Sequence, residues 1–228
     1  MLYIISTPIG NLGDISYRAS ELLEIVDVIA AEDTRRTGIL LQSLAIKAKK
    51  LVSYNEKNEN KRIPVFLDML KEGKDIALVS DSGTPCISDP GYRLVHSAVK
   101  NGITIAPVPG PSGILAALVA SGLPTDSFSF YGFLPKKQGR KTELLRKIAE
   151  MSETVLVYES PYRIANTLAL IEALMPNKNI CVARELTKKF EEFIRGKPIE
   201  VLEKIGQRTL KGEIVIVIGK EEKQQNPS

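Results

Sequence analysis

Short apolar runs alternate with polar, turn-rich segments along the whole chain. In the first half, the apolar runs of strand type cover residues 2–6, 28–31, 51–53, 76–79 and 103–108. Between them, apolar residues recur at helical spacing over residues 22–26 and 63–70, and a further helix is expected from about Pro90 to Lys100. The segment after Arg36, up to residue 50, is poorly patterned. Strands and helices that alternate at this spacing predict βαβ units, and therefore a mainly parallel sheet with right-handed crossovers.

Residues 122–127, GLPTDS, mark the expected domain boundary, because the alternation of the first half changes after them. Beyond this point, strands are expected over residues 128–133, 154–158, 180–183, 192–195 and 214–218. Ser160 and Pro161 are suited to cap and open one helix, and Pro198 to open another. We therefore expect an N-terminal α/β domain over residues 1–121, a C-terminal α/β domain over residues 122–219, and a polar tail over residues 220–228.

Two strands of the first half run into loops that are rich in glycine and proline. One loop covers residues 79–91, read VSDSGTPCISDPG, and the other covers residues 109–113, read PGPSG. Ligands of open α/β sheets bind beyond the carboxyl ends of the strands, so such loops on adjacent strands predict a binding site. The alternative is a pair of ordinary strand-to-helix connections. Residues 114–120, which follow the second loop, are all apolar and predict a helix that is buried on all sides.

The composition, with 43% hydrophobic and 25% charged residues among 228, is that of an ordinary soluble protein. The 31 basic and 27 acidic residues give a net charge of +4, which suits a polyanionic partner without requiring one. No apolar run approaches the ~20 residues that span a bilayer, and the amino terminus lacks a basic n-region. Cys86 and Cys181 lie far apart and predict neither a disulfide framework nor a zinc site. We expect a cytoplasmic protein without membrane association.

Several familiar motifs are missing from the sequence. No GxGxxG follows the first strand and no Walker-type Gly-Lys-Ser/Thr occurs, which argues against a dinucleotide-binding fold and an NTPase. His96, the single histidine, lies in an expected helix, and Cys86 has no neighbouring base, so structural roles are favoured for both. A magnesium site could be assembled from four loop carboxylates, those of Glu32, Asp33, Asp81 and Asp89. Loop carboxylates more often accept hydrogen bonds, so no metal is expected.

Seven motifs follow one another along the chain: TPIGNLGDI, AEDTRRT, LVSDSGTPCISDPG, PVPGPSG, GFLPKK, ESPYR and ARELTKKFEE. With these motifs the chain resembles the tetrapyrrole-methylase-like (class III) S-adenosylmethionine methyltransferases. Within that superfamily it is similar to the ribosomal RNA small-subunit methyltransferase I family, over about residues 1–219. It departs from the common pattern at Ser82 and Gly113, where alanine is frequent. Both changes replace one small residue with another.

The resemblance implies two α/β domains of the tetrapyrrole methylase type, a mainly parallel N-terminal sheet and a mixed C-terminal sheet. It also implies a homodimer, and S-adenosyl-L-methionine as cofactor in the cleft between the domains, with S-adenosyl-L-homocysteine as product. The family's cofactor contacts fall on Pro8, Ile9, Asp81, Gly83, Thr84, Ser112, Gly113, Tyr158, Ala183 and Ile214. Asp81 is expected to accept hydrogen bonds from the ammonium group of the donor. For Ala183 and Ile214 the alternative is a plain position in a strand core.

The activity that the resemblance implies is 2′-O-methylation of a cytidine ribose in the decoding centre of 16S rRNA, within the small ribosomal subunit. A ribose hydroxyl is a weak nucleophile, and Lys188 and Glu185 are the candidate catalytic residues that would help to remove its proton. Lysine would have to be neutral, which requires a desolvated or cation-flanked site. The alternative for Lys188 is a phosphate contact or a solvated surface charge.

RNA contacts are expected from basic residues near loop tips, with Tyr162 stacked on a splayed base. These residues are Arg35, Arg36, Lys136, Lys137, Arg140, Lys141 and Arg163. Two rival interpretations stay open. In one, the same fold methylates a tetrapyrrole precursor or a diphthine intermediate. In the other, the chain is a non-catalytic RNA-binding relative.

Overall fold

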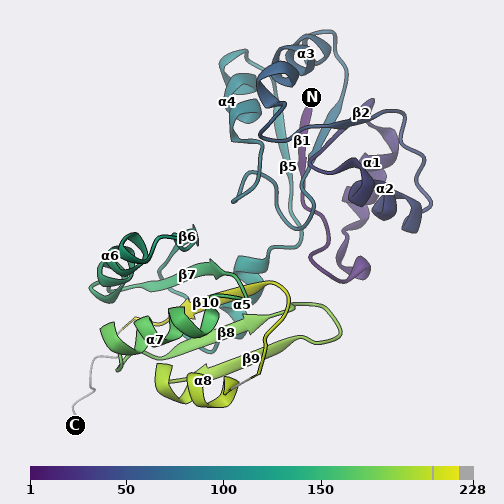
Figure 1. Cartoon of the computed structure of the whole chain (residues 1–228). Coiled ribbons are helices and arrows are strands. Elements are labelled where there is room, and N and C mark those ends of the chain that lie inside the picture. The colour runs from purple at the N-terminus through teal and green to yellow at the C-terminus, as the bar shows by residue number, and fades with distance from the viewer. Residues whose placement is uncertain (207, 221–228) are drawn as a thin grey trace. The chain divides into compact units, whose positions relative to one another are not determined.

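The computed structural model describes residues 1–206 and 208–220, which form two compact units (Figure 1). The first unit comprises Met1–Ser112, and the second begins at Gly113. This division falls before the helix that follows Ser112, whereas the sequence placed the domain boundary after residue 121. Of the predicted polar tail, Lys220 is described and its ammonium lies 2.8 Å from the Asp126 carboxylate. Residues 221–228 of that tail lie outside the described residues.

A five-stranded sheet in the order β3-β2-β4-β1-β5 forms the centre of the first unit. Its strands are β1 (Leu2–Ile5), β2 (Val28–Ala31), β3 (Leu51–Ser53), β4 (Ile76–Val79) and β5 (Ile105–Val108). Its helices are η1 (Leu12–Asp14), α1 (Tyr17–Ile25), α2 (Thr34–Ser43), α3 (Glu59–Lys71) and α4 (Tyr92–Lys100). All neighbouring strands run parallel, so the predicted parallel sheet is confirmed.

Successive side chains of each strand point to opposite faces of this sheet, and both faces are covered by helices. On one face, Leu2 and Leu78 pack with Phe66 of α3. On the other face, Ile5 packs with Leu23 of α1. The first unit is therefore an α/β/α sandwich. Its strands are apolar on both sides, which explains why they appear in the sequence as unbroken apolar runs.

Two features of the first unit differ from the sequence prediction. β1 lies between β4 and β5, so the two glycine- and proline-rich loops leave strands that are not adjacent. In addition, α2 occupies the segment that appeared poorly patterned. The Asp33 carboxylate caps this helix by accepting a hydrogen bond from the Arg35 N–H at 2.9 Å, and Thr37 and Leu41 are buried on its inner side.

The second unit contains a five-stranded sheet in the order β6-β7-β10-β8-β9. Its strands are β6 (Phe128–Phe133), β7 (Thr154–Glu159), β8 (Ile180–Arg184), β9 (Glu192–Gly196) and β10 (Ile214–Ile218). Its helices are α5 (Gly113–Ala120), α6 (Gln138–Ala149), α7 (Ile164–Leu174) and α8 (Pro198–Ile205). β6 and β7 are parallel and the other pairs are antiparallel, which confirms the mixed sheet.

Helices α6, α7 and α8 supply one core of this unit, in which Val157 and Ile216 pack with Leu145 and Leu168. Helix α5 contacts β10. The prediction of a helix buried on all sides is wrong for α5, because the Val119 side chain is 74% exposed.

The start of α7 also differs from the prediction. The helix begins at Ile164, and residues 160–163 form a turn closed by a hydrogen bond from the Arg163 N–H to the Ser160 carbonyl at 2.9 Å. Pro161 therefore occupies the second position of a turn, where its fixed φ is also favourable.

Candidate functional site

Three loops of the first unit are joined where β1, β4 and β5 end. Thr7 and Gly83 form a reciprocal backbone pair, with N–H to carbonyl distances of 2.9 and 3.0 Å. The Ser6 and Thr84 hydroxyls lie 2.9 Å apart, and the Thr84 hydroxyl donates to the Pro111 carbonyl at 3.1 Å. The predicted meeting of the two glycine- and proline-rich loops therefore occurs, although the strands that carry them are separated by β1.

Gly83 adopts a φ of +83°, which residues with a Cβ rarely adopt. An added Cβ would lie 3.2 Å from Ile9 Cγ2. The backbone N–H and carbonyl of Gly83 are both used by Thr7. Gly83 therefore connects the first loop to the loop after β4, and the sequence missed the part that Thr7 plays in this connection.

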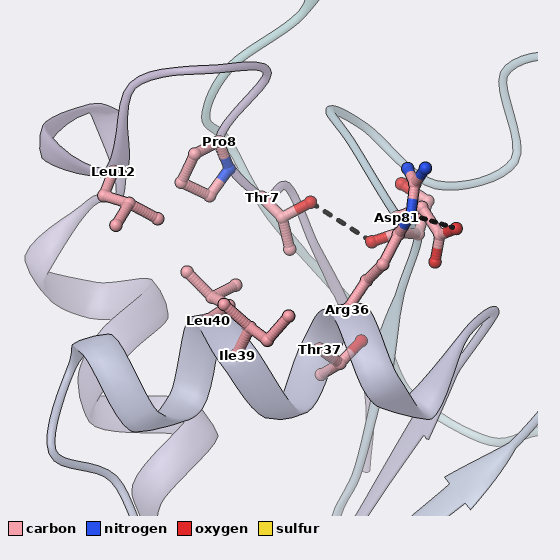
Figure 2. A pocket seen from close by; sticks show the side chains of 9 residues that line it. Thr7, Pro8, Leu12, Arg36, Thr37, Ile39, Leu40 and Asp81 are labelled. Atoms are coloured by element: carbon pink, nitrogen blue, oxygen red, sulfur yellow. Dashed lines mark hydrogen bonds and ion pairs between the residues drawn. The ribbon is translucent and has the colours of Figure 1, made fainter.

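Asp81 lies at the start of the loop after β4, with its side chain 22% exposed. Its carboxylate accepts a hydrogen bond from the Asp33 N–H at 2.9 Å. The same carboxylate lies 3.6 Å from Arg36 Nε (Figure 2). Burial, together with the nearby Asp81 charge, raises the pKa of Glu32. A hydrogen bond from the Arg35 side chain lowers the pKa of Asp33 to about 2. Two strand ends thus bring a dense group of charges together.

A pocket of about 130 Å³ adjoins Asp81 (Figure 2). It is lined by Thr7, Pro8, Leu12, Arg36, Thr37, Ile39, Leu40, Ser80 and Asp81. Half of its apolar lining, Ile39 and Leu40, comes from α2, a helix that the sequence pattern did not reveal. The Asp33 cap and the leucines at positions 40, 41 and 44 were the signals that could have revealed it. Arg36, predicted to contact RNA, lies beside Asp81 at the edge of this pocket, with its side chain 64% exposed.

The cofactor residues predicted beyond β5 belong to the second unit, except Ser112, which ends the first. In the second sheet Tyr158 and Ala183 both pair with Val215, so these three lie in one row across β7, β10 and β8. A Cβ added at Gly113 would lie 3.8 Å from the Tyr158 hydroxyl, which places the start of α5 beside this row. The side chain of Ile214 belongs instead to the core under α6, α7 and α8.

Lys188 and Glu185 lie in the loop after β8, which contains two non-glycine residues at positive φ, Glu185 (49°) and Thr187 (63°). The Lys188 ammonium lies 3.0 Å from Glu185 Oε1 and 3.1 Å from Glu213 Oε2. Partial desolvation lowers the pKa of Lys188, but the hydrogen bonds to these two carboxylates outweigh it and the pKa lies above its ordinary value. The site is therefore flanked by anions, contrary to what a neutral lysine base requires.

Of the predicted RNA-binding residues in the second unit, three are exposed and two form ion pairs with Glu159. Lys136, Lys137 and Arg140 are exposed around the start of α6. The Lys141 side chain is 3% exposed and its ammonium lies 3.4 Å from Glu159, so it does not fit the prediction of an RNA contact. Arg163 is 24% exposed and pairs with the same carboxylate at 2.5 Å. Sequence reasoning did not single out Glu159.

Within the part of the chain that the structure describes, no group of three or more histidine, cysteine, aspartate or glutamate side chains is arranged to hold a metal ion. None of the helices in residues 1–206 and 208–220 is long and apolar enough to cross a membrane.

Comparison with known proteins defines the class. Residues 1–201 match the family model described as Tetrapyrrole (Corrin/Porphyrin) Methylases. Among solved structures, the methyltransferase CobJ superposes with a TM-score of 0.69 at 19% identity, covering 96% of this chain and 93% of that one. A uroporphyrin-III C-methyl transferase from Thermus thermophilus, complexed with S-adenyl homocysteine, gives 0.63 at 18% identity, covering 96% of each chain. The fold is that of the tetrapyrrole methylases, as the sequence motifs predicted.

Relatives of known name identify the family within the tetrapyrrole methylases. The protein named Ribosomal RNA small subunit methyltransferase I from Hydrogenobaculum sp. is 47% identical over 223 residues, covering 96% of each chain. The protein of the same name from Halalkalibacterium halodurans is 46% identical over 217 residues, covering 95% of this chain and 75% of that one. The chain belongs to the ribosomal RNA small subunit methyltransferase I family, and it is a methyltransferase.

Proposed function

We propose that this protein transfers a methyl group from S-adenosyl-L-methionine to the ribose 2′-oxygen of a cytidine in 16S rRNA, within the small ribosomal subunit. The observation that carries the proposal is the 46–47% identity, over nearly the whole chain, to proteins named for methylation of small-subunit ribosomal RNA. The alternative of a tetrapyrrole substrate is supported only by structures at 18–19% identity, a level at which the fold alone is shared.

The residues at the ends of β1, β4 and β5 fit the chemistry of the donor, which supplies the methyl group when bound. A carboxylate has about four lone-pair positions. The Asp81 carboxylate uses one for the Asp33 N–H and lies near Arg36, so it retains acceptor capacity for an ammonium group. Pro8 borders the apolar pocket beside Asp81, which suits the less polar parts of such a molecule. No phosphate-binding loop is needed.

In the second unit, we propose that Gly113, Tyr158 and Ala183 also contact the donor. Tyr158 and Ala183 both pair with Val215, and a Cβ at Gly113 would lie 3.8 Å from the Tyr158 hydroxyl, which supports a common surface on one face of the second sheet. For Ile214, whose side chain is buried in the opposite core, only a backbone contact is proposed.

Deprotonation of the acceptor hydroxyl is assigned to neither Lys188 nor Glu185 as a free base. The ion pair keeps the lysine protonated and the carboxylate engaged. Partial desolvation, the largest single influence, raises the pKa of Glu185. The hydrogen bond and charge of Lys188, the Glu213 N–H and the charge of Arg184 together outweigh it, so the pKa lies below its ordinary value. Lys188 is thus held between Glu185 and Glu213, whose charges offset its own. Alignment of the reacting atoms alone can contribute ~7–11 kcal/mol in the best intramolecular cases.

The decisive experiment is mass spectrometry of the modified nucleotide after incubation of the protein with labelled donor and unmethylated small subunits. A single 2′-O-methylcytidine is expected, and uroporphyrinogen incubated in parallel should stay unmodified. Methylation of the porphyrin alone would overturn the assignment. Failure to bind the donor in calorimetry would favour a non-catalytic RNA-binding relative.

The exposed lysines before α6 test the RNA contact separately. Lys136→Glu combined with Lys137→Glu should weaken binding to 16S rRNA and leave donor binding intact, because two exposed positive charges become negative. Equal loss of RNA and donor binding would contradict this division. The expected homodimer can be tested by sedimentation, with a mass of twice 25.1 kDa.

A further inference from the structure

The carboxylate of Glu159, the last residue of β7, holds both ends of the turn that follows it. Its Oε1 accepts a hydrogen bond from the Ser160 N–H at 2.7 Å and lies 2.5 Å from Arg163 Nη2. Ser160 and Arg163 are also the first and last residues of the turn, joined by their own backbone hydrogen bond. One oxygen atom therefore fixes the turn at its entry and at its exit.

The second oxygen of Glu159 is held from the two helices that pack on β7. The Thr167 hydroxyl of α7 donates to Oε2 at 2.6 Å, and the Lys141 ammonium of α6 lies 3.4 Å away. Lys141 also donates to the Thr167 hydroxyl at 2.9 Å. The Glu159 side chain has no exposed surface. Both carboxylate oxygens are thus held, one by the turn and the other by the buried side chains of Lys141 and Thr167.

Stability alone does not account for this arrangement. Replacing a buried ion pair with apolar residues of similar volume is often neutral or stabilising, because desolvation offsets the attraction. An apolar residue at position 159, however, would leave the turn without its two ties to Oε1. What the carboxylate provides is a defined position for residues 160–163.

That turn carries Tyr162, whose side chain is 93% exposed. Arg163 extends the connection, since its Nη1 donates to the Leu134 carbonyl at 3.5 Å, two residues before the exposed Lys136. The turn that carries Tyr162 is therefore tied, through Arg163, to the segment that leads to the exposed Lys136. An exposed aromatic next to positive charges is the usual means of holding an unpaired base of RNA.

Tyr158, the residue before Glu159, has its ring on the other side of β7, since consecutive side chains of a strand point to opposite faces. A Cβ at Gly113 would lie 3.8 Å from its hydroxyl. The proposed donor contact and the turn-holding carboxylate are thus neighbours in sequence on different faces of one strand. A change confined to Glu159 can affect the turn and spare the donor contact.

We propose that Glu159 is a positioning residue for RNA recognition, which fixes the turn 160–163 so that Tyr162 stacks on an unpaired base of the rRNA substrate. The proposal rests on the proposed function, because it takes the nucleic acid to be the acceptor. Glu159 itself touches no RNA in this scheme.

The chain contains no tryptophan, so Tyr162→Trp introduces a single fluorescent reporter at the turn. Titration of this variant with unmethylated 16S rRNA should quench its fluorescence, because the indole stacks on a base. With Glu159→Gln added, which keeps the shape and removes the charge, the quenching should fall and the RNA affinity should weaken about tenfold, of the order of one stacking contact. Donor affinity should stay unchanged.

A second comparison separates positioning from general destabilisation. In the natural background, Tyr162→Ala and Glu159→Gln should each weaken RNA binding, and the double variant should be little worse than either single one, because both act through the same ring. Thr167→Val, which removes a buried donor to Glu159, should act in the same direction if Glu159→Gln does not fold. Lys178→Met is the matched control. It removes another buried lysine of this unit, one that donates to the Ile148 and Met151 carbonyls, and RNA affinity should be unchanged.

Two outcomes would overturn the inference and leave the proposed function standing, provided that the natural protein methylates rRNA. One is that the losses of RNA affinity caused by Glu159→Gln and Tyr162→Ala add up in the double variant. The other is that Glu159→Gln leaves the fluorescence quenching unchanged. Absence of RNA binding and methylation in the unaltered protein would overturn both.

Discussion

Gly91, which closes the loop after β4, is expected to tolerate no side chain. Its φ is +142°, and an added Cβ would lie 2.5 Å from Cys86 Sγ and 2.9 Å from Leu78 Cδ2. Backbone strain of this kind costs ~1–3 kcal/mol, and overpacking a buried site costs a further ~1–3 kcal/mol. Gly91→Ala should therefore destabilise the protein by about 4 kcal/mol, a large part of the ~5–15 kcal/mol that holds a typical domain folded.

Urea unfolding followed by far-UV circular dichroism measures this free energy, with the slope against urea expected to stay constant. Gly102→Ala is the matched control. Its φ is +68° and an added Cβ would meet no atom within 4 Å, so only the strain of about 1–2 kcal/mol should appear. Cys86→Ala combined with Gly91→Ala removes one of the two clashes and should recover part of the loss. Equal costs for the two glycine substitutions would refute the steric part of the reasoning.

Three further outcomes follow from the charges and thiols. Asp81→Asn should weaken donor binding in calorimetry by one to two orders of magnitude, since a hydrogen bond to a charged group contributes ~1.5–3 kcal/mol, whereas Asp14→Asn, on an exposed residue of η1, should have no effect. The raised pKa of Lys188 means that its ion pair adds stability below the ordinary lysine pKa and loses it as the pH rises through the folded pKa. The stability difference between the natural protein and Lys188→Met should thus be constant from pH 7 to 9 and shrink only above the ordinary lysine pKa; a loss already at pH 8 would show a lowered pKa instead. Burial raises the pKa of both Cys86 and Cys181 to about 11, so iodoacetamide at pH 8 should modify them slowly in the folded protein and rapidly in urea; fast labelling when folded would contradict the burial.

The sequence predicted the strands well because each is a short, mainly apolar run. Residues 28–31, 51–53, 76–79, 128–133 and 214–218 were predicted with the bounds that the structure shows. The boundaries of helices were harder, because their apolar faces are narrower. Helix α2 was missed since its first turns hold Thr34, Arg35 and Arg36, and its apolar residues come late.

The candidate site was predictable in its loops but not in its partners. Asp81 lies two residues after the end of β4, so its place at the sheet edge could be inferred. Its contacts with Asp33 and Arg36 depend on the neighbouring strand and on α2, which the sequence pattern did not reveal. Lys141 looked like part of an exposed basic run. Its spacing of four residues from Leu145 and seven from Ile148, both buried, could have placed it on the inner face of α6. Its partner, Glu159, comes from a distant strand that no local pattern connects with it.

Because side chains alternate between the two faces of β7, the proposed roles of Tyr158 and Glu159 both depend on the number of residues in this strand. Because the side-chain period is two, inserting or deleting one residue within β7 would exchange the faces of Tyr158 and Glu159. The carboxylate would then point away from Lys141 and Thr167, and the phenol would take its place among them. Natural variation in this protein should therefore hardly ever change the number of residues in β7.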